Sequence, residues 1–294
     1  MPADASADGA PSSWRIEWVR TRDGRDLYVE RRGPDSRRPM VVLEAGMGLS
    51  HHAWGAVVDR LAASVPTVAY DRSGLGRSPA DAAPRDLRRL ADDLSDLLDH
   101  LGDGPFVLVG HSWGGPVVRL VASERPERVA GLVLVDVTDE GCDEYFGRGA
   151  AAQNRLAMAL LPAIARTGAL RRPVDRLAAM LPEPSASGMR RDDGTAAAAA
   201  AQQAELRGHL DDLRQLRLSP PALPPVPVTY ISGAAASFLE RGRREPLVDA
   251  HRTSAAALPQ GRHVLAGRSG HHVPFTEPDL VADEVLRIVA SVSG

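Results

Sequence analysis

Apolar residues recur along this chain in two spacings. Short, nearly continuous apolar runs are typical of strands covered on both faces, and apolar residues three or four positions apart are typical of helices with one buried face. Leucines at 87, 90, 94, 97, 98 and 101, for example, share one face of a predicted helix. Strands are predicted at 14–20, 27–31, 40–43, 67–70, 106–109, 129–135, 226–231 and 262–266, and further helices at 54–63, 116–122, 246–257 and 278–292.

The order of these elements predicts a fold class. The first two strands flank the turn dipeptide Asp23-Gly24 and should form an antiparallel hairpin at the sheet edge. From residue 40 onward strands alternate with helices, which requires right-handed crossovers and a largely parallel sheet. We therefore expect an α/β protein with a mostly parallel, eight-stranded sheet flanked by helices, and a site at the carboxyl ends of its strands.

The pattern changes between residues 137 and 223. Alanine, leucine and arginine dominate there, prolines interrupt the segment, and no β-rich run occurs. Helical spacing is found near 156–163 and over 195–218. We interpret the segment as a helical cap, or lid, inserted into a core formed by residues 14–136 and 224–294. The composition alone would equally suit a surface linker with weak helices.

Composition and charge limit the possible partners. The chain has 294 residues, 44% of them hydrophobic and 25% charged, which is enough for one large core. Residues 1–13 predict a disordered leader that does not resemble a secretory signal. A net charge of -3 without a basic stripe argues against nucleic acid, and no apolar run reaches the roughly 20 residues that would cross a membrane. The single cysteine, Cys142, excludes an internal disulfide, and we expect a cytoplasmic protein.

One stretch carries recognisable chemistry. The residues Gly110-His111-Ser112-Trp113-Gly114-Gly115 lie between a predicted buried strand and a predicted helix, which is the context of a nucleophile elbow. The tight turn forces Ser112 into a strained conformation that exposes its hydroxyl. Glycines at 110 and 114 leave room where any side chain would collide. Ser112 is therefore the candidate nucleophile.

With this motif in this context, the chain resembles the α/β-hydrolase superfamily from about Trp14 to the C-terminus. The resemblance implies a serine nucleophile, a histidine base near the C-terminus, an acid between them in chain order, and a helical lid. Relatives that hydrolyse epoxides or haloalkanes carry an aspartate at the elbow, so Ser112 disfavours those reactions. The loop at 71–78 resembles the D-x-x-G-x-G-x-S loop of the superfamily, and we expect Asp71 to accept hydrogen bonds from nearby backbone N–H groups.

The resemblance also implies an oxyanion hole. In these hydrolases the loop after the strand at 40–43 supplies one of its backbone N–H groups. The sequence Glu44-Ala45-Gly46 departs from the usual His-Gly pair but keeps the glycine, so we assign the first donor to the N–H of Met47. The N–H of Trp113 is the second. Two converging donors would stabilise the negative charge of a tetrahedral intermediate.

The base is expected in the loop after the last strand. A serine hydroxyl needs a base within hydrogen-bonding reach and a carboxylate that fixes the tautomer of that base. His271 follows Gly270 and stands seven residues before Pro278, as the catalytic histidine of the superfamily does. His272 is the alternative.

The acid has several candidates. Most relatives carry it a few residues after the seventh strand, but residues 233–237 contain no carboxylate. Some hydrolases of this fold place it directly after the sixth strand, where Asp136 stands. Asp136 is therefore preferred, followed by Glu240 and Asp139.

No metal or cofactor is expected. The pairs at 51–52 and 271–272 are histidines, yet no ligand spacing such as H-E-x-x-H accompanies them. The glycines of the loop at 71–78 lack the G-x-x-x-x-G-K-[ST] pattern that cradles phosphates. We expect His51 and His52 to begin a helix or to line a pocket.

These residues together predict an activity. Ser112, deprotonated by His271, would attack an ester, lactone or thioester of a small apolar substrate, and water would then release the acyl group. Lid residues, among them Leu156, Leu160 and Met180, predict an apolar cleft. Two other functions stay open: a non-hydrolytic catalyst, such as a cyclase or C–C lyase, and a small-molecule receptor that uses the same pocket.

Overall fold

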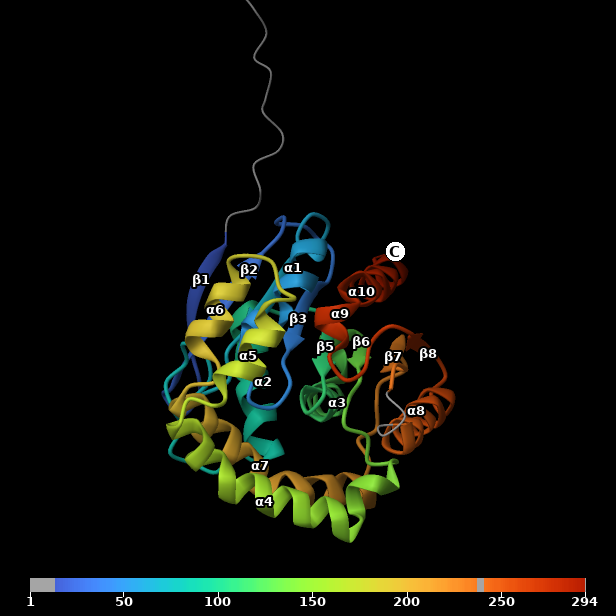
Figure 1. The fold of residues 1–294 in the computed structure, drawn as a ribbon. Helices are drawn as coiled ribbons and strands as arrows, with labels where there is room; N and C mark the ends of the chain where they lie inside the picture. The colour runs from blue at the N-terminus through green and yellow to red at the C-terminus, as the bar shows by residue number, and fades with distance from the viewer. Residues whose placement is uncertain (1–13, 237–240, 294) are drawn as a thin grey trace, which may run out of the picture.

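A computed structural model describes residues 14–236 and 241–293, and the predicted leader at 1–13 lies outside this part of the chain. One sheet runs through the molecule in the strand order β1-β2-β4-β3-β5-β6-β7-β8 (Figure 1). The strands are β1 (Arg15–Arg20), β2 (Asp26–Arg32), β3 (Met40–Glu44), β4 (Thr67–Tyr70), β5 (Phe106–His111), β6 (Val129–Val135), β7 (Val228–Gly233) and β8 (Gly261–Ala266). The helices are η1 (His51–Trp54), α1 (Gly55–Leu61), α2 (Leu87–Leu101), α3 (Gly114–Glu124), η2 (Pro126–Arg128), η3 (Asp143–Phe146), α4 (Arg148–Arg166), α5 (Arg171–Ala178), α6 (Ser185–Asp192), α7 (Ala196–Leu218), α8 (Arg241–Ala256), α9 (Val273–Thr276) and α10 (Pro278–Val292).

The sheet is mostly parallel, as the alternation of strands and helices predicted. Strand β1 pairs with β2 and β2 with β4 in the antiparallel sense, and every other neighbouring pair is parallel. The predicted hairpin therefore forms one edge of the sheet. Strand β3 lies near the middle, which explains why its apolar residues are continuous.

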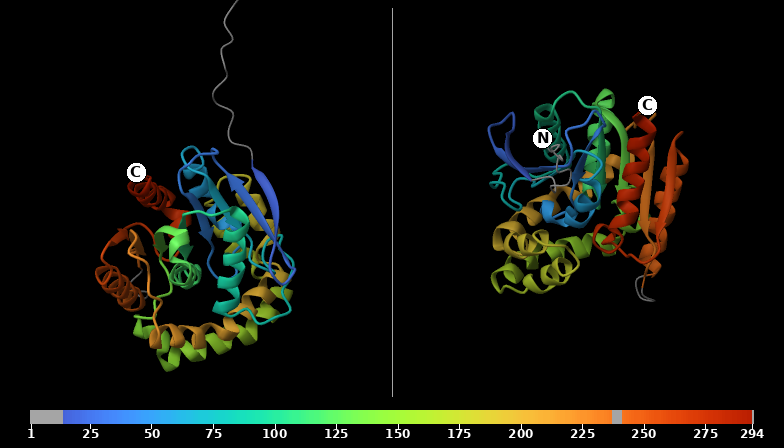
Figure 2. Two further views of the ribbon diagram at one scale, coloured as in Figure 1. Left: turned by 180° about the vertical axis from the view of Figure 1, so that it is seen from behind. Right: turned by 90° about the horizontal axis from the view of Figure 1, so that it is seen from above.

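Helices cover both faces of the sheet (Figure 2). Alternate residues of a strand point to opposite faces. In β3, Val41 and Leu43 join the core under α1 and α10, whereas Val42 joins the core under α2 and α3. Two apolar cores, one on each face, thus hold the sheet in place.

Four helices, α4 to α7, lie between β6 and β7, within the segment at 137–223 that was predicted to be a helical cap. Helix α7 packs along α4 and also contacts α2, while α6 contacts η1 (Figure 1). Because η1 follows β3 directly, the insertion covers loops at the carboxyl end of the sheet. No described helix combines the length and the apolar character needed to cross a membrane.

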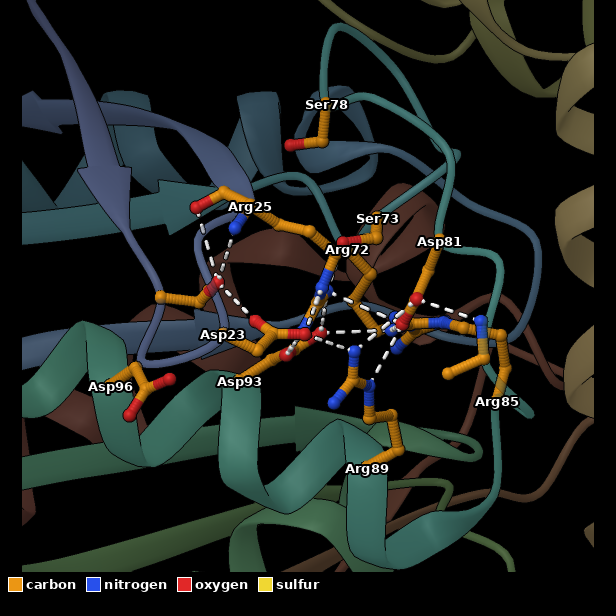
Figure 3. Close-up of polar contacts among 12 residues, drawn as sticks. Asp23, Arg25, Arg72, Ser73, Ser78, Asp81, Arg85, Arg89, Asp93 and Asp96 are labelled. Atoms are coloured by element: carbon orange, nitrogen blue, oxygen red, sulfur yellow. Dashed lines mark hydrogen bonds and ion pairs between the residues drawn. The ribbon is translucent and has the colours of Figure 1, made fainter.

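Charged side chains fasten the edge hairpin to α2 (Figure 3). The guanidinium of Arg25, between β1 and β2, donates to Asp93 of α2 at 3.0 Å. Arg85 donates to the same carboxylate at 2.9 Å. The loop at 71–78 is also tied down, because Asp71 accepts hydrogen bonds from the backbone N–H groups of Arg77 and of His51, at 2.9 and 2.8 Å. The structural contacts expected for Asp71 are therefore present.

Candidate active site

Ser112 lies in a sharp turn at the carboxyl end of β5. Its φ of +53° falls in the left-handed region, which residues with a side chain rarely adopt. A Cβ atom at Gly110 would lie 2.6 Å from the carbonyl oxygen of Gly114, and one at Gly114 would lie 2.5 Å from that of Glu44. The strained turn and its two obligatory glycines are present as predicted, and α3 begins directly after them.

Asp136 occupies the corresponding position at the end of the neighbouring strand, β6. Its φ is +44°, and its side chain is fully buried. One carboxylate oxygen, Oδ2, lies 2.7 Å from Nδ1 of His271. The other, Oδ1, accepts a hydrogen bond from the backbone N–H of Gly233 at 2.9 Å. The preferred acid and the preferred base, 135 residues apart in the chain, are therefore in direct contact.

The alternative residues have other contacts. The carboxylate of Asp139 accepts a hydrogen bond from the hydroxyl of Ser254 at 2.8 Å, and Glu240 lies outside the described residues. The ring of His272 packs edge-on against Phe275, with centroids 5.8 Å apart. Burial lowers the pKa of His272 to about 4. These contacts leave His271 as the histidine that meets the acid.

Arg244, on α8, also binds Asp136, and no sequence motif indicated it. Its two terminal nitrogens lie 2.8 and 2.5 Å from Oδ2, the same oxygen that meets His271. Burial raises the pKa of Asp136, but the hydrogen bond from His271 and the positive charge of Arg244 outweigh burial and hold that pKa below its ordinary value. Asp136 is therefore ionised near neutral pH, and its charge is shared by an imidazole and a guanidinium.

His111 joins the turn of Ser112 to the loop of His271. Its Nε2–H donates to the backbone oxygen of His271 at 2.9 Å, and the two imidazole centroids are 5.0 Å apart. Burial, reinforced by the neighbouring charge of His271, lowers the pKa of His111 to about 3. His111 thus bonds to the backbone of the histidine loop. Within the described part of the chain, no hydrogen bond joins the Ser112 hydroxyl to the His271 ring.

The loop after β3 lies against the elbow. A Cβ atom at Gly46 would come within 3.3 Å of Cβ of Ser112 and 3.0 Å of Nδ1 of His111. Gly46 therefore lies beside the serine and directly precedes Met47, and Trp113 follows the serine in the chain. The assignment of their two N–H groups to an oxyanion hole stays a prediction.

The insertion contacts the elbow through a second ring pair that sequence reasoning missed. The indole of Trp113 is buried, and the imidazole of His209 in α7 meets it with centroids 4.7 Å apart. Burial lowers the pKa of His209 to about 4, so this imidazole is neutral at physiological pH. A lone histidine in a polar helix face carries no motif, and only the packing of α7 reveals the contact.

The apolar cleft expected under the lid stays a prediction. A cavity of about 620 Å³ lies between η3, α4 and α8, and Leu156 lines it together with Cys142 and Tyr145, but neither Ser112 nor His271 does. Leu156, Leu160 and Met180 are 59%, 45% and 41% exposed.

The first histidine pair contacts two carboxylates, one in the core and one in the insertion. Nδ1 of His51 lies 2.8 Å from Asp71, and Nε2 of His52 lies 3.0 Å from Asp192 at the end of α6. Burial lowers the pKa of His51, but the hydrogen bonds and charges of Asp71 and Glu30 together outweigh burial and raise that pKa to about 10. Among the described residues, no three His, Cys, Asp or Glu side chains are grouped so that they could hold a metal ion.

Comparison with known proteins agrees with this architecture. The chain is 42% identical to lipase LipV of Mycobacterium tuberculosis over 114 residues, which is 38% of this chain and 41% of that protein. It is 28% identical to an AB hydrolase superfamily protein of Gibberella zeae over 90% of this chain and 92% of that protein. The solved structure of the epoxide hydrolase CorEH superposes with a TM-score of 0.70 at 21% identity, covering 95% of this chain and 99% of that chain.

The first of these likenesses is partial, because the chain matches only about two fifths of LipV. The sequence profile of the alpha/beta hydrolase family, however, matches residues 41–284. That range includes the elbow, the insertion and the histidine loop. The chain therefore belongs to the alpha/beta hydrolase family.

Proposed function

We propose that this protein is a serine hydrolase that cleaves an ester, lactone or thioester of a small apolar substrate through an acyl-enzyme. The observation that carries the proposal is the contact between His271 and the buried carboxylate of Asp136, in a loop that His111 fastens to the turn of Ser112. Family membership supports hydrolytic chemistry. A serine at the elbow supports a covalent ester intermediate.

Each residue of the site has a defined task in this mechanism. Nδ1–H of His271 donates to Asp136, which leaves the lone pair of Nε2 free to accept the proton of Ser112. Oγ of Ser112 then bonds to the substrate carbonyl carbon. The carbonyl oxygen becomes negative, and the N–H groups of Met47 and Trp113 stabilise it.

Collapse of this intermediate breaks the bond to the leaving alcohol or thiol, which takes its proton from Nε2 of His271. Water then attacks the acyl-enzyme while His271 accepts one of its protons. The carboxylic acid leaves, and the proton returns to Ser112. Because the Ser112 hydroxyl and the imidazole are not hydrogen bonded in this structure, the two groups must come within hydrogen-bonding distance before the attack.

Covalent labelling tests the proposal directly. Incubation with a fluorophosphonate should add one phosphonyl group to the wild-type chain, measured by intact mass, and none to Ser112→Ala. Hydrolysis of p-nitrophenyl butyrate should fall by about 10³-fold or more in Ser112→Ala and in His271→Ala. His272→Ala is the matched control and should keep most of the activity.

Two outcomes would overturn the proposal. An adduct that persists in Ser112→Ala would place the nucleophile elsewhere. A wild-type chain that forms no adduct and hydrolyses no activated ester would favour a receptor or a non-hydrolytic catalyst.

A further inference from the structure

Arg72 is buried, yet every N–H group of its guanidinium donates a hydrogen bond. Its side chain, which follows β4, is only 2% exposed. A guanidinium has five N–H donors, and here each of them has an acceptor. Nε and Nη2 donate to the two oxygens of Glu205 at 2.9 and 3.0 Å; Nη1 donates to Glu44 at 2.5 Å and to the carbonyl oxygen of Ala45 at 2.7 Å; Nη2 also donates to the carbonyl oxygen of Gly46 at 2.8 Å.

Two of these acceptors belong to the loop that carries the proposed oxyanion donor. The carbonyl of Gly46 and the N–H of Met47 are parts of one peptide unit. Because a trans peptide unit is planar, its C=O and N–H point in opposite directions. A guanidinium that holds the oxygen of Gly46 therefore fixes the direction of the Met47 N–H. The positive charge on the carbonyl side also polarises the unit and makes the N–H a stronger donor.

A further acceptor, the carboxylate of Glu205, comes from the insertion. Glu205 lies in the middle of α7, and its carboxylate is fully buried against Arg72. The pairing is bidentate, which is the most directional contact that a carboxylate makes with arginine. The position of α7 thus fixes one side of the guanidinium, and the guanidinium in turn orients the peptide unit before Met47.

We propose that Arg72 is the positioning residue of the oxyanion hole and that helix α7 controls this residue through Glu205. If the insertion moved away from the core, the guanidinium would lose its two hydrogen bonds to Glu205, and the peptide unit before Met47 would be free to rotate. The N–H of Met47 would then point into the oxyanion hole only when the insertion is docked. This inference rests on the proposed function, because it assigns a task to the oxyanion hole of that mechanism.

The test compares two acids of α7. Glu205→Gln keeps the shape of the side chain but removes the charge that holds Arg72. Asp212→Asn is the matched control, because Asp212 also ties α7 to the core, through the backbone N–H of Leu87 at 2.9 Å, without touching the loop. We expect Glu205→Gln to lower kcat for p-nitrophenyl butyrate about tenfold or more with KM changed less than twofold. Asp212→Asn should leave both parameters within twofold.

A transition-state analogue separates positioning from general loss of stability. A trifluoromethyl ketone adds to the serine and places an oxyanion in the hole. Its inhibition constant should rise in Glu205→Gln by the same factor by which kcat falls. It should not change in Asp212→Asn. Arg72→Lys provides a second variant, because a lysine has the charge but not the planar fork and should show the same loss.

The outcomes discriminate between the two proposals. If fluorophosphonate labels the wild type at Ser112 but both Glu205→Gln and Arg72→Lys keep wild-type kcat and inhibitor affinity, this inference is wrong and the serine mechanism stands. If Glu205→Gln fails to fold, as measured by its thermal unfolding, Arg72→Lys decides alone. If the wild type forms no adduct, the proposed function fails and this inference fails with it.

Discussion

At the scale of single residues, Ser112 and Asp136 share an unusual backbone. Among the described residues, they are the non-glycine residues with positive φ. Such conformations cost on the order of 1–3 kcal/mol each. Hydrogen bonds from the neighbouring strands hold them, because the N–H of Ser112 donates to Val135 at 3.1 Å and that of Asp136 to Ile231 at 2.7 Å. The sheet therefore sustains the strain that turns a hydroxyl and a carboxylate toward one histidine loop.

Arg244→Gln should change the pH dependence of the reaction. Arg244 and His271 bind the same oxygen of Asp136, and the charge of Arg244 helps to lower the pKa of that carboxylate. Without Arg244 the pKa of Asp136 should rise, and a protonated Asp136 no longer accepts the hydrogen bond from Nδ1–H of His271. The acid limb of kcat/KM should therefore move to higher pH. Initial rates between pH 4 and 9 measure this shift.

Arg252→Gln is the control for that experiment. Arg252 lies on the same helix but pairs with Asp249 at the surface, where both side chains are more than half exposed. Its profile should coincide with that of the wild type. An Arg244→Gln profile that also coincides would mean that the guanidinium has no effect on the pKa of Asp136.

Gly46→Ala should impair catalysis more than folding. The added Cβ would lie 3.0 Å from His111 and 3.3 Å from Ser112, so the loop must move by a few tenths of an ångström. We expect kcat/KM to fall about tenfold, because a displaced donor stabilises the oxyanion less well. Thermal unfolding should change little. Gly267→Ala, where a Cβ meets no atom within 4 Å, should affect neither property, and equal losses in both variants would contradict the prediction.

Sequence patterns predicted this site unevenly. Ser112 was predicted because an elbow needs glycines at fixed positions around it. Asp136 could only be preferred among three acids, since a carboxylate at a strand end has no spacing that ties it to a distant histidine. Arg244 and Arg72 carried no signal at all, because the direction of a long side chain depends on packing that no local pattern encodes.

At the scale of elements, the connection from α6 to α7 places two neighbouring acids in opposite environments. Asp192 pairs with His52 and Arg191. Asp193 is buried, and one of its oxygens has no hydrogen-bond partner among the described residues. Burial raises the pKa of Asp193 to about 7, whereas the bonds from His52 and Arg191 outweigh burial and lower that of Asp192 to about 2.

Asp193→Asn should therefore stabilise the protein, increasingly so as the pH rises. Between pH 4 and 7 the folded state binds a proton at Asp193 that the unfolded state has released, so wild-type stability falls as pH rises through this window, by up to about 1.4 kcal/mol per pH unit. Because the amide does not titrate, the free energy of unfolding of the variant does not fall in this way. Urea unfolding at pH 4.5 and pH 8 should show a small difference from wild type at the first pH and a clear gain at the second.

Asp192→Asn should have the opposite effect on the free energy of unfolding. A carboxylate with a lowered pKa stabilises the folded state at pH values above its ordinary pKa near 4, and this stabilisation is lost as pH falls toward 2. The variant should therefore be less stable than wild type at pH 8 and approach it in acid. If both asparagine variants shifted in the same direction at pH 8, the opposite environments of the two acids would be refuted.

Periodicity predicted the elements well where apolar residues mark them. Helices α2 and α10 and strands β4 and β6 have the predicted bounds. Strand β7 begins at Val228, two residues later than predicted, because Pro227 has no N–H for the ladder. Helix α8 begins at Arg241, before the predicted Pro246, in a polar stretch with no apolar period.

At the scale of the whole molecule, buried ion pairs attach the periphery to the sheet. Arg25 and Asp93 hold the edge hairpin, and Arg72 and Glu205 hold the insertion. Losing one partner leaves the other charge buried without compensation, which is more costly than losing an exposed pair. The stability of the molecule should therefore depend on pH through its carboxylates.

The free energy of unfolding should fall steeply in acid. The hydrogen bonds and charges of three arginines exceed the effect of burial and lower the pKa of Asp81 to about 2, and Asp192 has a similar value. Such groups contribute stability above the unfolded value near 4 and lose it as pH falls through the folded value. Urea unfolding should give a maximum of stability near pH 4 to 5, a decline below pH 4, and above it the loss that the raised pKa of Asp193 causes. A curve that stays level down to pH 3 would contradict this account.

Arg25→Met connects this acid sensitivity to the hairpin. Its guanidinium is 14% exposed and meets Asp93 and Asp81, so its removal leaves buried carboxylates with fewer cations and should cost about 3 kcal/mol at pH 7 (Figure 3). Arg15→Met breaks the Arg15–Asp35 pair of the same hairpin, but that pair is exposed and should cost less than about 0.5 kcal/mol. The loss in Arg25→Met should shrink as pH falls, because protonated carboxylates no longer repel one another. Equal losses at the two positions would instead show that strand pairing alone holds the hairpin to the sheet.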